Sequence, residues 1–301
     1  MRIFLTGATG FIGSRIVPEL IAGGHQLLGM TRSESGARAL ADVGAEAHHA
    51  TLEDLDSIRA GVEHADAVIH TAFDHDFSNF VANCEKDARV IAAMGEVLRG
   101  SNRPLLITSG VGMGGSAPGV LATERVFDRT HPNPRAASEI AGAALLDAGV
   151  HVAVVRLPQV HDTERQGLVS PLVTMAREKG AMAYIGEGAN RWAAAHVSDV
   201  ATLYARAIDR AVPGARYHAV AEEGVAARAI AEAIAEGLGI PALSITPDQA
   251  PDYFGWMAMF ASLDIAASSA WTRAELDWNP TGPGLIEDLR AMDYSVVFDR
   301  Y

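Results

Sequence analysis

A glycine-rich turn near the N-terminus constrains the fold more than any other feature of the sequence. Residues 2–6 form an apolar strand candidate, and the chain then reads Thr6-Gly-Ala-Thr-Gly-Phe-Ile-Gly13. Gly7 permits a tight turn, Gly10 lets the backbone approach a pyrophosphate, and Gly13 lets a following helix pack closely on the strand. Unpaired N–H groups at the start of that helix attract phosphate. The spacing therefore predicts a strand–turn–helix unit that binds a dinucleotide.

Short apolar segments alternate with helical patterns along the first half of the chain. This order predicts an α/β fold in which a doubly wound parallel sheet of the Rossmann type carries helices on both faces. The second half is less regular, and there we predict a smaller C-terminal α/β region that binds substrate. We place an NADP-binding domain at 1–160 and the substrate-binding region at 161–301, and we allow their strands to interleave. Strands are predicted at 2–6, 26–30, 45–49, 66–71, 104–108, 151–156, 182–185, 215–220 and 242–246, and helices at 11–23, 35–43, 54–61, 78–100, 134–148, 168–179, 198–211 and 225–238.

Charge and cysteine content exclude several classes of partner. The 301 residues carry a formal net charge of −13, which argues against nucleic acid and against an anionic membrane. Cys84 is the only cysteine, so no disulfide forms within the chain, which suits the cytoplasm. No apolar run is long enough to span a membrane, and the histidines show no metal-ligand spacing. We therefore expect a cytoplasmic protein that binds a small-molecule substrate and no metal.

The end of the second predicted strand decides which dinucleotide fits. The sequence there is Met30-Thr-Arg-Ser33, with Arg32 at or next to the position where NAD-dependent enzymes place an acidic residue for the adenosine ribose. A guanidinium suits the 2′-phosphate of NADP, whereas Glu34 close by favours NAD. We predict NADP, with NAD as the less favoured alternative. The residues predicted to contact the cofactor are Gly7, Thr9, Gly10, Phe11, Ile12, Gly13, Thr31, Arg32, Ser33, Leu52, Ala72, Phe73 and Pro158.

Four motifs together resemble one superfamily. The glycine motif at 6–13 resembles the extended short-chain dehydrogenases/reductases, the group of nucleotide-sugar epimerases and dehydratases. Val68-Ile-His-Thr-Ala72 looks like the strand-four motif of that group, and Arg156-Leu-Pro158 like its arginine-x-proline after strand six. His196-Val-Ser-Asp-Val-Ala201 looks like its H-V-x-D-V-A segment. The resemblance extends from Met1 to about Leu289 and implies a Rossmann fold with NAD or NADP.

The catalytic residues of that superfamily are missing. Its members use a serine or threonine with a tyrosine and a lysine spaced Y-x-x-x-K, but the first tyrosine here is Tyr184, far beyond the expected helix. In one register, residues 131–135 (His-Pro-Asn-Pro-Arg) read H-x-x-x-R, which resembles an atypical branch in which this basic pair is thought to substitute. In the other, residues 134–139 (Pro-Arg-Ala-Ala-Ser-Glu) match P-Y-x-x-S-K. Arg135 then takes the tyrosine position and Glu139 the lysine position, and this register fits the local pattern better.

The residues at these positions limit the chemistry. Arg135 can polarise a carbonyl or clamp a carboxylate, but its guanidinium cannot donate a proton at any working pH. His131 carries the imidazole of this segment, which can exchange a proton near neutral pH, and His161 is a second candidate. Glu139 is expected to accept hydrogen bonds from ribose hydroxyls or to form an i,i+4 surface pair with Arg135. The predicted catalytic residues are His131, Arg135, Glu139 and Ser109, the last beside the position of the family's serine or threonine, and the predicted substrate contacts are His161, Arg191 and Trp192.

These observations favour an NADP-dependent oxidoreductase that moves a hydride between nicotinamide and a carbonyl or alcohol carbon of a small organic substrate. One alternative is a sugar-nucleotide epimerase or dehydratase that uses NAD, and another is a catalytically inactive NADP-binding sensor. We also predict a homodimer, because the helices at 78–100 and 134–148 resemble a pair that forms a four-helix interface in related proteins. Small residues on the second helix suit close approach, although the same face could pack within its own subunit.

Overall fold

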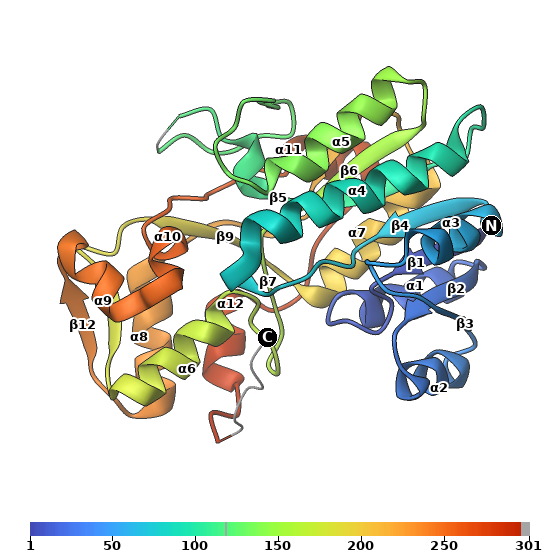
Figure 1. The fold of residues 1–301 in the computed structure, drawn as a ribbon. Coiled ribbons are helices and arrows are strands. Elements are labelled where there is room, and N and C mark those ends of the chain that lie inside the picture. The colour runs from blue at the N-terminus through green and yellow to red at the C-terminus, as the bar shows by residue number, and fades with distance from the viewer. Residues whose placement is uncertain (118, 296–301) are drawn as a thin grey trace.

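The computed structural model describes residues 1–117 and 119–295, and it is built around a seven-stranded parallel sheet with helices on both faces (Figure 1). The strand order is β10-β6-β5-β4-β1-β2-β3, and every strand pair in this sheet is parallel. The predicted doubly wound fold is therefore confirmed. The strands are β1 (Arg2–Thr6), β2 (Gln26–Thr31), β3 (Glu46–His49), β4 (Ala67–His70), β5 (Leu105–Gly110), β6 (Val152–Leu157) and β10 (Arg216–His218).

The helices cover the two faces because alternate strand residues point to opposite sides. In β1, Ile3 and Leu5 join a core cluster with α1 and α7, whereas Phe4 joins a second cluster with α3, α4 and α5. These two apolar layers make up most of the core of the first domain. The helices on the first face are α1 (Gly13–Ala22), α2 (Glu34–Asp42) and α7 (Val197–Arg210), and those on the second are α3 (Leu55–Glu63), α4 (Phe80–Leu98) and α5 (Ala136–Asp147).

A second lobe with its own apolar core lies beside this domain (Figure 1). It holds the two-stranded parallel sheet of β8 (Met182–Ile185) and β12 (Ala242–Ile245), while the three-stranded sheet β11-β9-β7 connects it to the first domain. The strands of that connecting sheet are β7 (Gln159–His161), β9 (Arg191–His196) and β11 (Glu222–Ala226). The remaining helices are α6 (Val169–Lys179), α8 (Ala227–Leu238), α9 (Ala250–Phe254), α10 (Ala258–Ala261), α11 (Ala270–Leu276) and α12 (Leu285–Ala291), with short 3-10 turns at Phe77–Asn79, Val111–Gly114, Pro247–Gln249 and Gly255–Met257.

Each strand and helix predicted from the sequence is present, with ends that differ by a residue or two. The sequence interpretation missed β7, β9, β11 and the short helices α9 to α12, because these segments are too short or too mixed to show a clear period. The predicted division at position 160 is not a clean spatial boundary, since β10 pairs with β6 and α7 packs on α1. Residues 296–301 of the predicted second region lie outside the described residues. Within the described part of the chain, no helix could cross a membrane, and no three histidine, cysteine or acidic side chains gather as metal ligands would.

The small residues of α5 pack against their own subunit. A Cβ on Gly142 would lie 2.7 Å from Ile107 Cδ1, and a Cβ on Gly95 of α4 would lie 2.2 Å from Leu145 Cδ2 of α5. Exposed apolar side chains nevertheless remain on both helices, since Val81 is 57% and Ile140 is 37% exposed. A dimer through α4 and α5 would use these exposed positions and not the buried small residues of α5.

We expect a particle of twice the 31.7 kDa chain mass in multi-angle light scattering at micromolar concentration. Ile140→Lys should shift it toward a single chain, because a lysine in the contact would be buried without a partner. A mass of one chain for the unmodified protein would contradict the dimer.

Candidate cofactor and active site

The turn after β1 has the backbone that a dinucleotide site requires. Gly7 has a φ of +71°, and a Cβ there would lie 2.8 Å from the backbone nitrogen of Ala72. A Cβ on Gly13 would lie 2.0 Å from the Gly7 carbonyl oxygen, so a side chain would prevent α1 from starting this close to β1. Gly10 donates its N–H to the Gly7 carbonyl over 2.9 Å and closes the turn. The cradle therefore fits the pyrophosphate of NAD or NADP.

The other residues predicted to contact the cofactor lie at the carboxyl-terminal edge of the sheet. Thr31 ends β2, and Leu52 follows β3. Ala72 and Phe73 follow β4, and Pro158 lies between β6 and β7. Ligands of open α/β sheets bind along this edge, where the strand order reverses. The structure thus brings these positions to one edge, and their contact with a cofactor stays a prediction.

Arg32 and Ser33 lie between β2 and α2. The Ser33 hydroxyl accepts a hydrogen bond from the Gly36 N–H over 3.1 Å and caps α2. The Arg32 side chain is exposed, and no hydrogen bond or ion pair within the described residues engages it. Glu34, the residue that favoured NAD, lies 3.8 Å from the His49 ring nitrogen. The guanidinium of Arg32 is therefore free to meet a ligand at the end of β2.

Arg135 lies at the start of α5 and reaches toward the ends of β4 and β5. Its guanidinium donates to the Thr108 carbonyl over 2.9 Å and to Asp87 Oδ2 over 2.8 Å, and it also donates to the Ser138 hydroxyl. The guanidinium carbon lies 4.3 Å from the centre of the Phe73 ring, within range of a cation–π contact. These contacts fix the charge next to a residue predicted to contact the cofactor.

Asp87, on α4, is the buried anion of this cluster and is 1% exposed. Its Oδ1 accepts from His70 Nε2 over 2.9 Å, and its Oδ2 also accepts from the Ser138 hydroxyl. Burial raises the pKa of Asp87, but the charge of Arg135 and the contact with His70 outweigh it and hold the pKa far below its usual range. Asp87 is therefore ionised at neutral pH.

Sequence reasoning missed Asp87 and His70 as site residues, although the sequence carries a signal for the first. Asp87 falls on the same helical face as Cys84, Val90 and Ile91, which are all buried. A carboxylate on the apolar stripe of a helix is costly to bury unless it is paired. Such a position is a reason to search for a buried cation.

A tyrosine does reach this region, but from α7 and not from α5. Tyr204 is fully buried, and its hydroxyl lies 2.6 Å from Thr108 Oγ1, which in turn donates to the His70 carbonyl over 2.7 Å. Burial raises the pKa of Tyr204 far above its usual value. The phenol therefore supports the end of β5 and is a poor proton donor.

The expected surface pair between Glu139 and Arg135 is wrong. Glu139 is 1% exposed, and both of its oxygens accept from Arg156 over 2.8 Å. Arg216 adds a third contact over 3.2 Å. Burial raises the pKa of Glu139, but Arg156 outweighs it, so that the pKa lies below its usual value. This carboxylate is buried and already bound by two arginines, which disfavours a contact with ribose hydroxyls.

Ser109 is buried on β5, one residue after Thr108. Thr108 points toward Tyr204 of α7, and successive residues of a strand point to opposite faces, so Ser109 points toward the face that carries α5. The part of β5 that contacts Arg135 is the Thr108 carbonyl. A catalytic role for Ser109 stays a prediction.

His131 lies in the loop that precedes α5. Its backbone N–H donates to the Asp128 carbonyl over 3.3 Å, and its Nδ1 accepts from the Asn133 N–H over 3.1 Å. Two residues earlier, Arg129 pairs with Asp147, the last residue of α5, at 2.8 Å. These hydrogen bonds of His131 are local, and its role as a proton donor stays a prediction.

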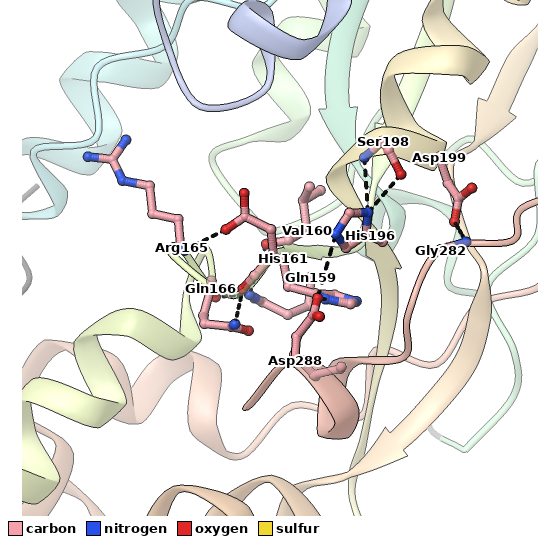
Figure 2. Close-up of polar contacts among 12 residues, drawn as sticks. Gln159, Val160, His161, Arg165, Gln166, His196, Ser198, Asp199, Gly282 and Asp288 are labelled. Carbon is pink, nitrogen blue, oxygen red and sulfur yellow. Dashed lines mark hydrogen bonds and ion pairs between the residues drawn. The ribbon is translucent and has the colours of Figure 1, made fainter. Parts of the chain in front are cut away.

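His161 is buried between the two lobes, where β7, β9 and α12 meet (Figure 2). Its Nδ1 lies 2.6 Å from Asp288 Oδ2, and His196 Nε2 lies 3.8 Å from the same oxygen. Burial lowers the pKa of His161 and outweighs the opposite effect of Asp288, so the ring is neutral at neutral pH. Figure 2 also shows Asp199 bonded to Gly282, over 2.9 Å. These contacts join α12 to β7 and the segment before α12 to α7, and His161 is closed to solvent.

The remaining predicted substrate residues have structural partners. Arg191 pairs with Asp264 over 2.9 Å and is partly exposed. Trp192 is 2% exposed and packs in the core of the second lobe, where it borders a small apolar cavity with Tyr184 and Phe254. The burial of Trp192 favours core filling over substrate contact.

Known proteins support the family that the motifs resemble. The model of the NAD dependent epimerase/dehydratase family matches residues 3–220. An uncharacterized protein of Schizosaccharomyces pombe, C2A9.02, is 43% identical over 98% of this chain and 100% of its own. The uncharacterized protein YLL056C of Saccharomyces cerevisiae is 39% identical over the same shares.

A solved structure agrees in fold. The dTDP-glucose 4,6-dehydratase DesIV from Streptomyces venezuelae, with NAD and TYD bound, has a TM-score of 0.76 at 19% identity, covering 96% of each chain. At that identity the likeness concerns the fold alone. The family match over most of the chain goes further, and with the glycine cradle it leads to one conclusion: this chain belongs to the NAD dependent epimerase/dehydratase family.

Proposed function

We propose that the protein is an NADP-dependent oxidoreductase that acts on a carbonyl or alcohol group of a small apolar substrate. The observation that carries this proposal is Arg135, which occupies the start of α5 and is held by Asp87, Thr108 and Phe73. Bound NADPH would supply the hydride. The cofactor would be held by the glycine turn at 7–13 and by the loop at 72–73.

Arg135 would act on the substrate by electrostatic stabilisation. A guanidinium fixed in advance stabilises the negative charge that grows on a carbonyl oxygen as it is reduced. The Arg135 guanidinium has five N–H donors and makes three hydrogen bonds to protein groups. It therefore retains donors for a substrate oxygen. Reduction of a carbonyl also requires a proton on the oxygen, and another group must donate it, because arginine cannot.

The apolar character of the substrate is inferred from aromatic rings beside Arg135. Phe73, beneath the guanidinium, lies 6.4 Å from Phe80, ring centre to ring centre. Phe77 stacks on Trp256 at 4.7 Å and 11°, and thereby joins the start of α4 to the α9–α10 segment. A substrate that approaches Arg135 from this side would meet flat apolar surfaces. We expect aromatic or alicyclic aldehydes and ketones to react better than polar ones.

NADP should be preferred because Arg32 is exposed and unpaired at the end of β2. Arg32→Ala should weaken NADPH binding by ~1–3 kcal/mol, the loss of a charge-assisted hydrogen bond, and should change NADH binding little. Isothermal titration of both cofactors measures this. Arg38→Ala, an exposed arginine on α2, is the matched control. Tighter binding of NADH than of NADPH by the unmodified protein would contradict the preference.

The function itself is tested by incubating the protein with NADPH and a panel of apolar carbonyl compounds, with the loss of NADPH absorbance as the measurement. We expect oxidation of NADPH with part of the panel. The family and the fold also support a second candidate, a sugar-nucleotide epimerase or dehydratase. Conversion of a nucleotide sugar without net loss of cofactor would favour that candidate. Tight NADPH binding with no turnover of either class would favour a sensor.

The proton donor can be identified separately. If His131 supplies the proton, His131→Ala lowers turnover about 10²–10⁴-fold and leaves NADPH affinity intact. Unchanged turnover and an unchanged pH profile would assign the proton to water or to the substrate itself.

A further inference from the structure

We infer that Asp87 is a positioning residue for the reaction: it holds Arg135 in its working orientation and ties that orientation to the cofactor turn. The inference rests on the proposed function, since it concerns the group that would polarise the substrate. Asp87 would not touch substrate. It acts through Arg135, and its carboxylate is 1% exposed.

The hydrogen bonds of Asp87 fix the orientation of the Arg135 guanidinium. Asp87 Oδ2 accepts from Arg135 over 2.8 Å and also from the Ser138 hydroxyl. Ser138 lies one helical turn after Arg135 on α5, so both donors of α5 converge on one carboxylate oxygen of α4. With the Thr108 carbonyl at 2.9 Å on the other nitrogen, the guanidinium is held at both of its terminal nitrogens. Removal of the carboxylate would take away the charged partner of Arg135 and also the acceptor that orients the Ser138 hydroxyl, so the head group would be held less firmly.

The other carboxylate oxygen connects to the cofactor turn through buried side chains. Asp87 Oδ1 accepts from His70 Nε2, and His70 Nδ1 lies 2.7 Å from Thr6 Oγ1. Thr6 Oγ1 also accepts the Ala72 N–H over 3.2 Å, and the Thr71 hydroxyl donates to the Thr6 carbonyl over 2.7 Å. A continuous hydrogen-bonded chain therefore runs from the residue before Gly7 to Arg135.

The hydrogen bonds of Asp87 compensate for the burial of its carboxylate. His70 donates from Nε2 to Asp87 Oδ1, and His70 Nδ1 shares a second hydrogen bond with Thr6 Oγ1. Asp87 accepts from three donors and carries one negative charge against the one positive charge of Arg135. The pair can be buried without excess charge, and its hydrogen bonds are directional.

A purely structural role would not require ions at this place. Apolar side chains of similar volume often replace a buried ion pair at no loss of stability, because the two ions must be desolvated. Arg135 is the member of the pair that is partly exposed, at 16%, whereas Asp87 is closed. The positive charge of Arg135 is therefore accessible from one side, at the edge of the sheet where a ligand would lie.

The test is chemical rescue. Arg135→Ala should lose turnover with the apolar carbonyl panel, and millimolar guanidinium should restore part of it by occupying the vacated place beside Asp87. The double variant Arg135→Ala/Asp87→Asn should show no rescue, because the carboxylate that binds the cation is gone. Arg135→Ala/Asp147→Asn, which changes an exposed acid on α5, is the control and should keep the rescue. Equal rescue with and without Asp87 would overturn the inference.

Two further measurements separate positioning from folding. Asp87→Asn keeps the size of the side chain, and it should lower kcat about 10²-fold, as a misplaced catalytic group does, with little change in KM. Asp87→Glu, which keeps the charge, should recover part of kcat. A loss confined to KM, or equal losses in the two variants, would contradict the inference.

A binding readout keeps this inference distinct from the proposed function. Guanidinium should raise the melting temperature of Arg135→Ala and not that of the double variant, whether or not any carbonyl is reduced. If the unmodified protein reduces nothing, the proposed function fails, while the guanidinium shift still decides whether Asp87 holds that cation. If turnover is present and the shift and the rescue are both absent, the inference about Asp87 fails alone.

Discussion

Arg135→Ala is expected to lower carbonyl turnover about 10²–10³-fold and to leave NADPH affinity near that of the unmodified protein, because one preorganised electrostatic donor is lost from the transition state. The guanidinium is held by Asp87 and Thr108 and rests on Phe73, so the loss removes a fixed group and not a mobile surface charge. Steady-state kinetics with NADPH titration measure both quantities.

Two controls make this result specific. Arg129→Ala removes an exposed arginine that pairs with Asp147 outside the cluster, and it should leave turnover unchanged. Arg135→Lys keeps the charge but has a single nitrogen, so it cannot reproduce the hydrogen bonds that two guanidinium nitrogens make to Asp87 and the Thr108 carbonyl, and it should recover little. Full activity of Arg135→Ala would remove arginine from the mechanism.

The largest loss of stability is expected for Glu139→Gln. Glu139 and Arg156 are both closed to solvent and share two hydrogen bonds of 2.8 Å. Removal of one partner of a buried ion pair costs ~3–5 kcal/mol of unfolding free energy, because the other charge remains buried. Urea denaturation measures this. Glu96→Gln, which breaks an exposed pair with Arg59, should cost no more than ~1 kcal/mol.

The pH dependence of stability follows from the same pair. The pKa of Glu139 in the folded protein lies below its ordinary value of 4.5. Its contribution is therefore complete above pH 4.5 and is lost as the pH falls through the folded pKa. The difference in stability between the unmodified protein and Glu139→Gln should shrink as the pH is lowered below that value. A constant difference across this range would show that the carboxylate charge does not stabilise the fold.

Local patterns explain why the sequence predicted the sheet domain so closely. A buried parallel strand is a short apolar run, and a helix that covers it shows a 3.6-residue period, so each can be recognised without its neighbours. The second lobe offers fewer such signals, because β7 and the helices after 250 are only a few residues long. Their structure depends on contacts such as those of Asp288 with His161 and His196, which are far apart in sequence.

The active-site predictions show the same limit at the level of single residues. Sequence spacing placed Arg135 and Glu139 on one helix, four residues apart, and a shared surface pair was a reasonable expectation. In the folded protein the two side chains diverge, Arg135 toward Asp87 of α4 and Glu139 toward Arg156 of β6. Spacing along a helix gives the angle between two side chains, but the elements packed on either side decide which charge each one meets.

The sequence by itself determined the family, the succession of strands and helices along the chain in the sheet domain, and the glycine cradle. Each of these depends on neighbours along the chain, such as the 2.0 Å approach that a Cβ at Gly13 would make to the Gly7 carbonyl. Only the tertiary structure decided which groups surround Arg135. Asp87, His70 and Thr108 come from three different elements, and their side chains meet only when α4, β4 and β5 pack together. Long-range packing, which no local pattern encodes, sets the charge and the direction of the candidate active site.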